Sequence, residues 1–244
     1  MSKGLPFRVT HRVGPRYQTF QLAYLKSMAQ RIGVLGSGIV GRTLAEGFLQ
    51  HGYEAMLGTR DPARGEVPVW LAANPAAQAG TFGETAAFGE IIVLAVMGRV
   101  VDEVLDQAGP DHFTGKILID ATNPLADDKP VNGILKFATG PNESLGEKVQ
   151  ALLPNAHVVK AFNSVGSALM INPKFEQGTP TMFLCGNNPD AKGVVSGICE
   201  QFGWEPFDCG DIAASRAIEP LCILWTLPGF LRNDWRHAFK MLTK

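Results

Sequence analysis

The segment from residue 31 to residue 60 constrains the fold of this chain more than any other part of it. A short apolar stretch, Ile32–Leu35, leads directly into Gly36-Ser37-Gly38-Ile39-Val40-Gly41, which has the spacing G-x-G-x-x-G. An amphipathic stretch, Val40–Gln50, follows the motif, and a second apolar stretch lies at residues 53–57. Glycine is common in this chain, so the motif alone is a weak signal. Its position between a strand and a helix predicts a β-α-β unit that binds a dinucleotide.

Each glycine of the motif has a physical role in such a unit. Gly36 permits a tight turn, Gly38 lets the backbone approach a pyrophosphate, and Gly41 lets the helix pack closely on the strand. The free amides of the first helical turn then face the phosphates. We therefore predict a phosphate-binding segment that consists of Gly36, Ser37, Gly38, Ile39, Val40 and Gly41.

The end of the second strand predicts which dinucleotide binds. NAD enzymes place an acidic residue there to accept from the ribose 2′-hydroxyl, whereas this strand ends in Gly58-Thr59-Arg60-Asp61. A threonine hydroxyl and a guanidinium suit a 2′-phosphate. Asp61 is the alternative acid, and we interpret it instead as the cap of a helix that begins at Pro62. The segment favours NADP(H), with Thr59, Arg60 and Arg64 as ligands.

Apolar stretches alternate with helical stretches along the rest of the chain. This alternation predicts an α/β, Rossmann-type, doubly wound fold with a mostly parallel sheet and a small C-terminal helical lobe. We expect a dinucleotide-binding domain at residues 28–170 and a smaller C-terminal part at residues 171–244, which completes the acceptor site or a dimer interface. The predicted strands are Ile32–Leu35, Ala55–Leu57, Ile91–Val96, Ile117–Ile119, Val158–Ala161, Met182–Leu184 and Trp204–Phe207.

Two segments interrupt this alternation. Residues 126–143 are rich in Gly, Pro and Asp, which is typical of a long functional loop, and the loop ends at a capping-box pattern, Ser144 to Glu147. The tail is predicted to form two helices, at residues 212–226 and 232–242, with a break at Pro228-Gly229. Its aromatic residues form either a wall of the acceptor site or a core or dimer contact; they are Trp225, Phe230 and Trp235.

Charge and cysteine content narrow the class of protein. The formal net charge is −1, which gives no electrostatic argument for nucleic acid or an anionic membrane. Residues 1–30 contain five basic residues and no acidic one; we expect residues 1–27 to be a disordered or loosely packed basic leader, with an organelle address as the alternative. The four cysteines lack metal-ligand spacing, which indicates reduced thiols in a cytoplasmic protein without a metal site.

Several motifs together resemble a known superfamily. The stretch RIGVLGSGIVGRTLAEGFLQHGYEAMLGTRDP resembles the N-terminal half of the NADPH-dependent deazaflavin (coenzyme F-420) reductases. It is also similar to the cytosolic oxidoreductase domain of the six-transmembrane metalloreductases. Further matches are IIVLAVM, LIDATNPL and VVKAFNSVGSALM, so the resemblance spans residues 31–170. The tail does not match the deazaflavin enzymes, and the membrane half of the metalloreductases has no counterpart here.

The resemblance implies further cofactor ligands at three strand ends. Ala95, Val96 and Met97 would line the ribose and diphosphate. Thr122, Asn123 and Pro124 would border the nicotinamide, as would Ala161 and Asn163 one strand further on. Asn123-Pro124 is alternatively a simple turn, and Asn163 is alternatively the cap of a helix at residues 164–170.

No histidine or other side chain stands out as an acid, base or nucleophile, and the role of Lys160 stays open between the site and solvent. Hydride transfer between two stacked rings does not require a protein proton donor, whereas alcohol dehydrogenases need one. We therefore predict an NADPH-dependent oxidoreductase whose acceptor is a flavin or deazaflavin, and we expect a homodimer. The alternatives are a β-hydroxyacid or imine reductase and a non-catalytic NADPH-binding sensor; the short C-terminal part argues against the reductase.

Overall fold

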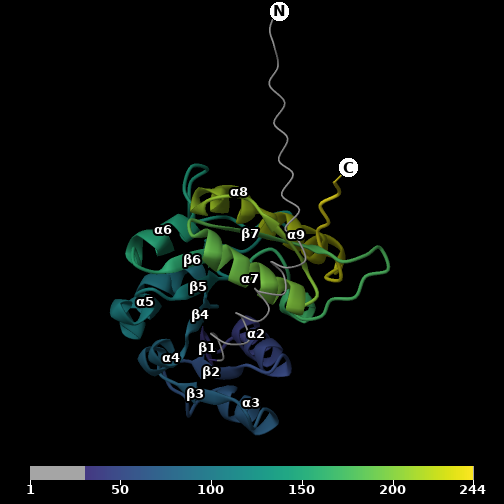
Figure 1. Cartoon of the computed structure of the whole chain (residues 1–244). Coiled ribbons are helices and arrows are strands. Elements are labelled where there is room, and N and C mark those ends of the chain that lie inside the picture. Colours follow the sequence, from purple (N-terminus) through teal and green to yellow (C-terminus); the bar gives the residue numbers. More distant parts are fainter. Residues whose placement is uncertain (1–30, 244) are drawn as a thin grey trace, which may run out of the picture.

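Residues 31–243 are described by the structure, a computed structural model, and the predicted leader at residues 1–27 lies outside them. These residues form an eight-stranded sheet with the order β3-β2-β1-β4-β5-β6-β7-β8 (Figure 1). β7 is antiparallel to β6, and every other neighbouring pair is parallel. The predicted doubly wound α/β fold is therefore confirmed. The strands are β1 (Arg31–Leu35), β2 (Glu54–Gly58), β3 (Gln78–Gly80), β4 (Ile91–Leu94), β5 (Ile117–Asp120), β6 (His157–Lys160), β7 (Thr181–Gly186) and β8 (Glu205–Asp208).

Helices cover both faces of this sheet, as a parallel sheet requires. Two buried clusters mark the two faces: one contains side chains of α2 and α7, and the other contains side chains of α4, α5 and α6. The helices are α2 (Ile39–Gln50), α3 (Val67–Ala73), α4 (Phe82–Phe88), α5 (Val101–Ala108), α6 (Leu145–Leu152), α7 (Pro189–Gln201), α8 (Ser215–Ile218) and α9 (Pro220–Arg232).

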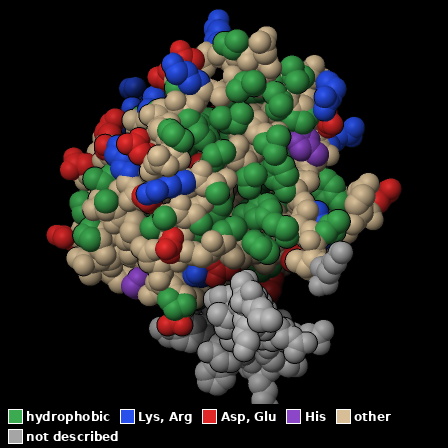
Figure 2. Space-filling view, turned by 90° about the horizontal axis from the view of Figure 1, so that it is seen from above, with side chains coloured by type: hydrophobic (Ala, Val, Ile, Leu, Met, Phe, Trp, Pro, Cys, Tyr) green, Lys and Arg blue, Asp and Glu red, His purple; other side chains and the backbone are tan. Residues whose placement is uncertain are grey.

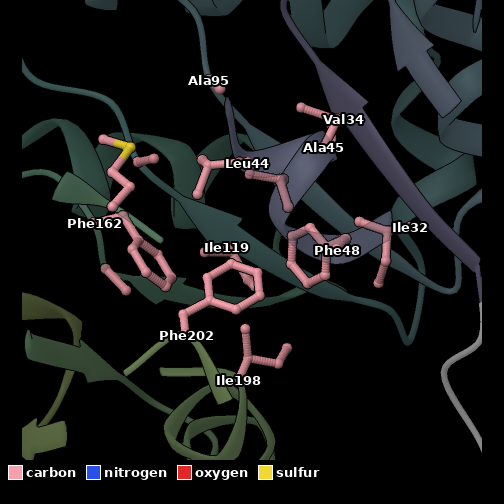
Figure 3. Packing of buried hydrophobic residues seen from close by; sticks show 14 of the residues in the cluster. Ile32, Val34, Leu44, Ala45, Phe48, Ala95, Ile119, Phe162, Ile198 and Phe202 are labelled. Carbon is pink, nitrogen blue, oxygen red and sulfur yellow. The ribbon is translucent and has the colours of Figure 1, made fainter. Parts of the chain in front are cut away.

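The strands contribute to both clusters by alternation. In β4, Ile91 and Val93 belong to the α2–α7 cluster, while Ile92 and Leu94 belong to the opposite one. Since successive side chains of a strand point to opposite faces, a strand that is covered on both sides is apolar throughout. On the α2–α7 face, the ring centroid of Phe48 lies 5.0 Å from that of Phe202, the residue just after α7. This edge-on contact joins the two helices over the sheet (Figure 3).

The long loop and the cap that follows it match the sequence prediction. Within residues 126–143 the chain contains no helix, and Val131 and Ile134 exchange two backbone hydrogen bonds of 3.0 Å around a turn with positive φ at Asn132 and Gly133. The Ser144 hydroxyl accepts from the backbone amide of residue 147 at 3.2 Å and begins α6.

The tail differs from its prediction. One helix, α9, runs through Pro228 to Arg232, and residues 233–243 form no helix. Pro228 removes a single backbone bond, to the carbonyl of Leu224, and the helix tolerates this because Leu224 is on its exposed side, 54% exposed. Asn233 then ends the helix in the left-handed conformation, with φ of 54°. The residues beyond it are fixed by tertiary contacts instead of helical ones.

Two shorter predicted helices are also wrong. After β6 there is only a 3₁₀ turn, Ser167–Leu169, and Gly166 rather than Asn163 precedes it. The helix predicted to begin at Pro62 is a turn in which the Asp61 carboxylate accepts from the amide of residue 63 at 3.0 Å. α3 begins only at Val67. Asp61 thus satisfies a local backbone amide in a turn, which is an alternative to capping a helix, whereas the Asn163 side chain donates to the distant Asn123 and Ile218.

The four cysteines are free thiols, three buried and one partly buried. Within residues 31–243, no helix is long and apolar enough to span a membrane. Apolar side chains gather on the face seen in Figure 2, the side on which α8 and α9 lie. The exposed apolar residues of α9 are Leu224, Phe230 and Leu231, and those of the loop are Val131 and Ile134.

Candidate functional site

The main candidate site is a cavity of about 620 Å³ at the carboxyl ends of β1, β2, β4 and β5. The strand order reverses between β1 and β4, and open α/β sheets bind ligands at that position. We call this cavity the cleft. Its lining residues are Gly36, Ser37, Gly38, Ile39, Val40, Thr59, Arg60, Phe82, Ala95, Val96, Met97, Gly98, Arg99, Val100, Glu103, Val104, Ala121, Thr122, Asn123, Leu125 and Ala126.

The glycines at the edge of the cleft occupy three different environments. Gly36 has φ of 123°, and a Cβ there would lie 2.3 Å from the carbonyl oxygen of Ala95. A Cβ on Gly41 would lie 1.9 Å from the carbonyl oxygen of Gly36, so α2 packs directly on the turn. A Cβ on Gly38 would meet no atom within 4 Å. Gly36 and Gly41 are therefore required by the fold itself, whereas Gly38 leaves open space where a ligand can approach.

The N-terminus of α2 is free to bind an anion. The first turn of a helix has amides without a helical partner, and here the N-cap residue, Gly38, supplies no side-chain cap. No acidic residue lies in the first turn. Phosphate oxygens suit both the free amides and the positive end of the helix dipole. These residues therefore fit the pyrophosphate of a dinucleotide.

The ends of β1 and β2 meet where a ribose 2′-phosphate would be recognised. The Ser37 hydroxyl donates to the Thr59 hydroxyl at 3.3 Å, and Arg60 lies beside them, exposed at the cleft wall. Arg64 is also exposed but is not among the lining residues, and it pairs with Asp61 at 3.1 Å. Thr59 and Arg60 therefore lie together at the cleft, whereas Arg64 lies outside it and remains a sequence prediction.

The far end of the cleft is formed by the loops after β4 and β5. These loops touch closely, since a Cβ on Gly98 would lie 2.2 Å from the carbonyl oxygen of Asn123. The Asn123 side chain donates to the backbone oxygen of Asn163 at 2.8 Å, and Asn163 donates back to it at 3.1 Å. Asn163 thus supports the cleft without lining it. Three other predicted ligands are buried next to the cleft but do not line it; they are Gly41, Pro124 and Ala161.

Beneath this end of the cleft lies a group of buried charges, which we call the ion cluster: Asp120, Lys160 and Glu219. The Lys160 ammonium is 2.7 Å from the Asp120 carboxylate and 2.9 Å from that of Glu219, and each side chain is at most 1% exposed. Burial alone would lower the pKa of Lys160, but the two carboxylates outweigh this effect and hold that pKa above its ordinary value. Lys160 is therefore charged and points neither to solvent nor into the cleft.

Sequence reasoning missed several residues that line the cleft. Most of them continue a strand-end loop that was identified only in part, and Phe82 follows β3 at the start of α4. A signal for the loop residues was present, because residues just beyond a strand end lie on the same edge as the strand end itself. The missed residues are Phe82, Gly98, Arg99, Val100, Glu103, Val104, Ala121, Leu125 and Ala126.

The chemistry available in the cleft is limited. Among its lining residues, all of which lie in the described part of the chain, none is His, Lys, Tyr or Cys, and the charged ones are Arg60, Arg99 and Glu103. Arg99 forms an ion pair with Asp127, which does not line the cleft. This set can bind anions and orient a ligand, but it offers no ordinary proton donor for an alcohol or carbonyl.

Comparison with known proteins identifies the family of this chain. Residues 31–124 match the profile of the family described as NADP oxidoreductase, coenzyme F420-dependent. The crystal structure of a putative F420-dependent NADP-reductase from Arthrobacter sp. FB24 has 32% identity and a TM-score of 0.82 to this chain. The similarity covers 88% of this chain and 100% of that one. This chain belongs to the F420-dependent NADP oxidoreductase family.

Two curated relatives show the breadth of this family. The F420-dependent NADP reductase of Methanocaldococcus jannaschii is 29% identical over 140 residues, which cover 54% of this chain and 59% of that protein. The metalloreductase STEAP3 of Rattus norvegicus is 31% identical over 216 residues, which cover 86% of this chain. The chain spans only 41% of the length of that metalloreductase. Membership places the chain in a family of NADP-dependent oxidoreductases, and the hydride acceptor is a separate question.

Proposed function

We propose that this protein transfers hydride between NADP(H) and a flavin or deazaflavin acceptor. The observation that carries the proposal is the cleft itself. It joins an anion-binding helix terminus to an apolar opening and contains no histidine, lysine, tyrosine or cysteine among the described residues that line it. Ring-to-ring hydride transfer is the reaction that needs least from such side chains, because orientation and exclusion of water supply most of the catalysis.

The residues of the cleft would divide the work between binding and orientation. The amides at the start of α2 would hold the pyrophosphate, and Thr59 and Arg60 would hold the 2′-phosphate. The nicotinamide would then lie near Thr122 and Asn123, at the ends of the central strands. When bound, NADPH supplies the hydride from C4 of its nicotinamide ring.

The acceptor would enter through the cleft opening, beside Met97, Leu125 and Ala126. No residue of α8, α9 or the segment after them is among the lining residues of the cleft. The aromatic residues of the tail instead pack on one another: the ring centroids of Trp225 and Trp235 are 5.8 Å apart. We therefore propose an acceptor site at the apolar opening and not under the tail helices.

The proposal is tested by mixing the purified protein with NADPH and a panel of acceptors. The panel contains FMN, FAD, riboflavin and a deazaflavin, and oxidation of NADPH is followed as the loss of absorbance at 340 nm. We expect turnover with at least one ring acceptor and none with simple ketones or imines. NADPH binding measured in parallel separates two failures: tight binding without turnover would indicate a non-catalytic NADPH sensor.

A further inference from the structure

The ion cluster surrounds the Lys160 ammonium with three oxygen atoms. Besides the two carboxylates, the ammonium donates to the backbone oxygen of Thr122 at 3.0 Å. The ammonium is fully buried, so one hydrogen bond and two ion pairs to the protein hold it in place. Such a group has one well-defined position, and so do the three backbone segments that it joins: the end of β5, the end of β6 and the junction between α8 and α9.

The cluster also fixes every polar group of Thr122, a residue that lines the cleft. The Asp120 carboxylate accepts from the Thr122 amide at 2.9 Å and from its hydroxyl at 2.6 Å, while Lys160 binds its carbonyl oxygen. Thr122 is 2% exposed. Its position in the cleft wall is therefore set from behind by Asp120 and Lys160.

Glu219 connects the same cluster to α6 and to the tail. Its carboxylate accepts from the amides of Leu145 and Gly146 at 3.0 and 2.9 Å, at the positive end of the α6 dipole. The cluster carries one cation and two carboxylates, and these amides offset the excess negative charge. The residue before Glu219 is also tied to the cleft wall, since Asn163 donates to the carbonyl oxygen of Ile218 at 3.1 Å.

We propose that Lys160 and Glu219 are positioning residues for the nicotinamide half of the NADP(H) site. Lys160 holds the carbonyl oxygen of Thr122 and the Asp120 carboxylate that binds the amide and hydroxyl of Thr122, and Glu219 holds Lys160 in place. Lys160 and Glu219 thus fix the cleft wall at Thr122 without touching the cofactor. Replacement of a buried ion pair by apolar residues often leaves stability unchanged or improves it, so a purely structural role does not require these charges. The fixed geometry at Thr122 supplies a reason for them.

This inference depends on the proposed function for NADP(H) binding, and it does not depend on the acceptor. The experiment compares two ligands by calorimetry: NADPH, and 2′,5′-ADP, which contains the phosphorylated adenosine half and lacks nicotinamide. For Lys160→Met and Glu219→Gln we expect 2′,5′-ADP affinity within about twofold of the original protein. NADPH affinity should fall by about tenfold or more. The fluorescence of bound NADPH should shift, because it reports the surroundings of the reduced ring.

Two controls and a second test variant make the comparison decisive. Lys148→Met removes a half-exposed lysine of α6 that pairs with Asp102 on the surface, and it should change neither affinity. Arg60→Ala should weaken both ligands. Glu219→Gln preserves size and one acceptor oxygen, so it tests the inference even if Lys160→Met, which leaves two buried carboxylates, does not fold.

If the ion-cluster variants lose affinity for NADPH and 2′,5′-ADP in parallel, the role of the cluster is merely structural and the inference is overturned. The inference is also overturned if both affinities are retained. If the unaltered protein binds both ligands but reduces no acceptor, the proposed function fails while this inference is still tested. If it binds neither ligand, the NADP(H) site is itself wrong and both proposals fall.

Discussion

At the scale of single residues, we propose Arg60 as the side chain that distinguishes the two nicotinamide cofactors. It lies at the end of β2 next to Thr59, and no acidic residue lines that wall of the cleft within the described chain. A hydrogen bond to a charged group contributes about 1.5–3 kcal/mol. We therefore expect Arg60→Ala to weaken NADPH binding by that amount and to change NADH binding little.

Isothermal titration of both cofactors checks this prediction. Arg232→Ala is a matched control, since Arg232 is an exposed arginine at the end of α9, away from the cleft. It should leave both affinities unchanged. If Arg60→Ala weakened NADPH and NADH equally, Arg60 would not recognise the 2′-phosphate.

Two glycines of the same motif should respond differently to alanine. A Cβ on Gly38 meets nothing in the protein, so Gly38→Ala should leave the thermal midpoint nearly unchanged and still weaken NADPH binding by crowding the pyrophosphate. A Cβ on Gly41 overlaps the carbonyl oxygen of Gly36. Gly41→Ala should therefore destabilise the fold, by about 1–3 kcal/mol, as well as weaken binding. Calorimetry and thermal unfolding of the two variants should separate these effects; an equally large loss of stability in Gly38→Ala would contradict the prediction.

At the scale of elements, local signals predicted the phosphate-binding turn and every described strand except β3, which has only three residues. β4 is a run of four apolar residues, which indicates a strand covered on both faces. The turn at Gly36 follows from residues adjacent in sequence, so no tertiary information was needed. The same holds for Ser144, which caps α6 as its pattern indicated.

Elements that depend on distant contacts were not predictable in this way. The end of the chain has a helical pattern, yet it lies extended because Trp225 donates to the carbonyl oxygen of His237 and Thr181 donates to that of Phe239, both at 2.8 Å. Tertiary contacts outweigh the weak intrinsic helix propensity there. The ion cluster was missed for the same reason: Asp120, Lys160 and Glu219 are brought together only by the sheet and the tail.

The way the tail packs predicts a large effect of one tryptophan. Trp225 is 7% exposed, and its ring occupies the space where Gly166 lacks a side chain. Trp225→Ala should lower the free energy of unfolding by about 3–5 kcal/mol, since it leaves a cavity between α9 and the loop after β6. The neighbouring Leu224 is 54% exposed, and Leu224→Ala should change stability by less than about 0.5 kcal/mol. Urea unfolding measures both; similar small losses would mean that the tail does not pack on the body in solution.

At the scale of the whole molecule, the buried thiols should set how stability depends on alkaline pH. Burial raises the pKa of Cys185 and of Cys222 from 9.0 to about 11, and it raises that of Cys199 further. In the unfolded chain these thiols lose their protons near their ordinary value, whereas in the folded protein they stay protonated. Their contribution to stability is therefore complete below about pH 9 and is lost as pH rises through the folded pKa.

The free energy of unfolding should therefore decline measurably at alkaline pH. Ionisation of each thiol whose pKa is raised to about 11 should remove about 2 kcal/mol from the free energy of unfolding by about pH 11. Part of that loss should be visible by about pH 10. Urea unfolding under reducing conditions, repeated from pH 7 to pH 10, gives the slope. The double variant Cys185→Ala, Cys222→Ala should start less stable at pH 7 and decline less steeply, because two of the responsible groups are gone. An unchanged slope in that variant would show that other groups, such as surface lysines, cause the alkaline loss.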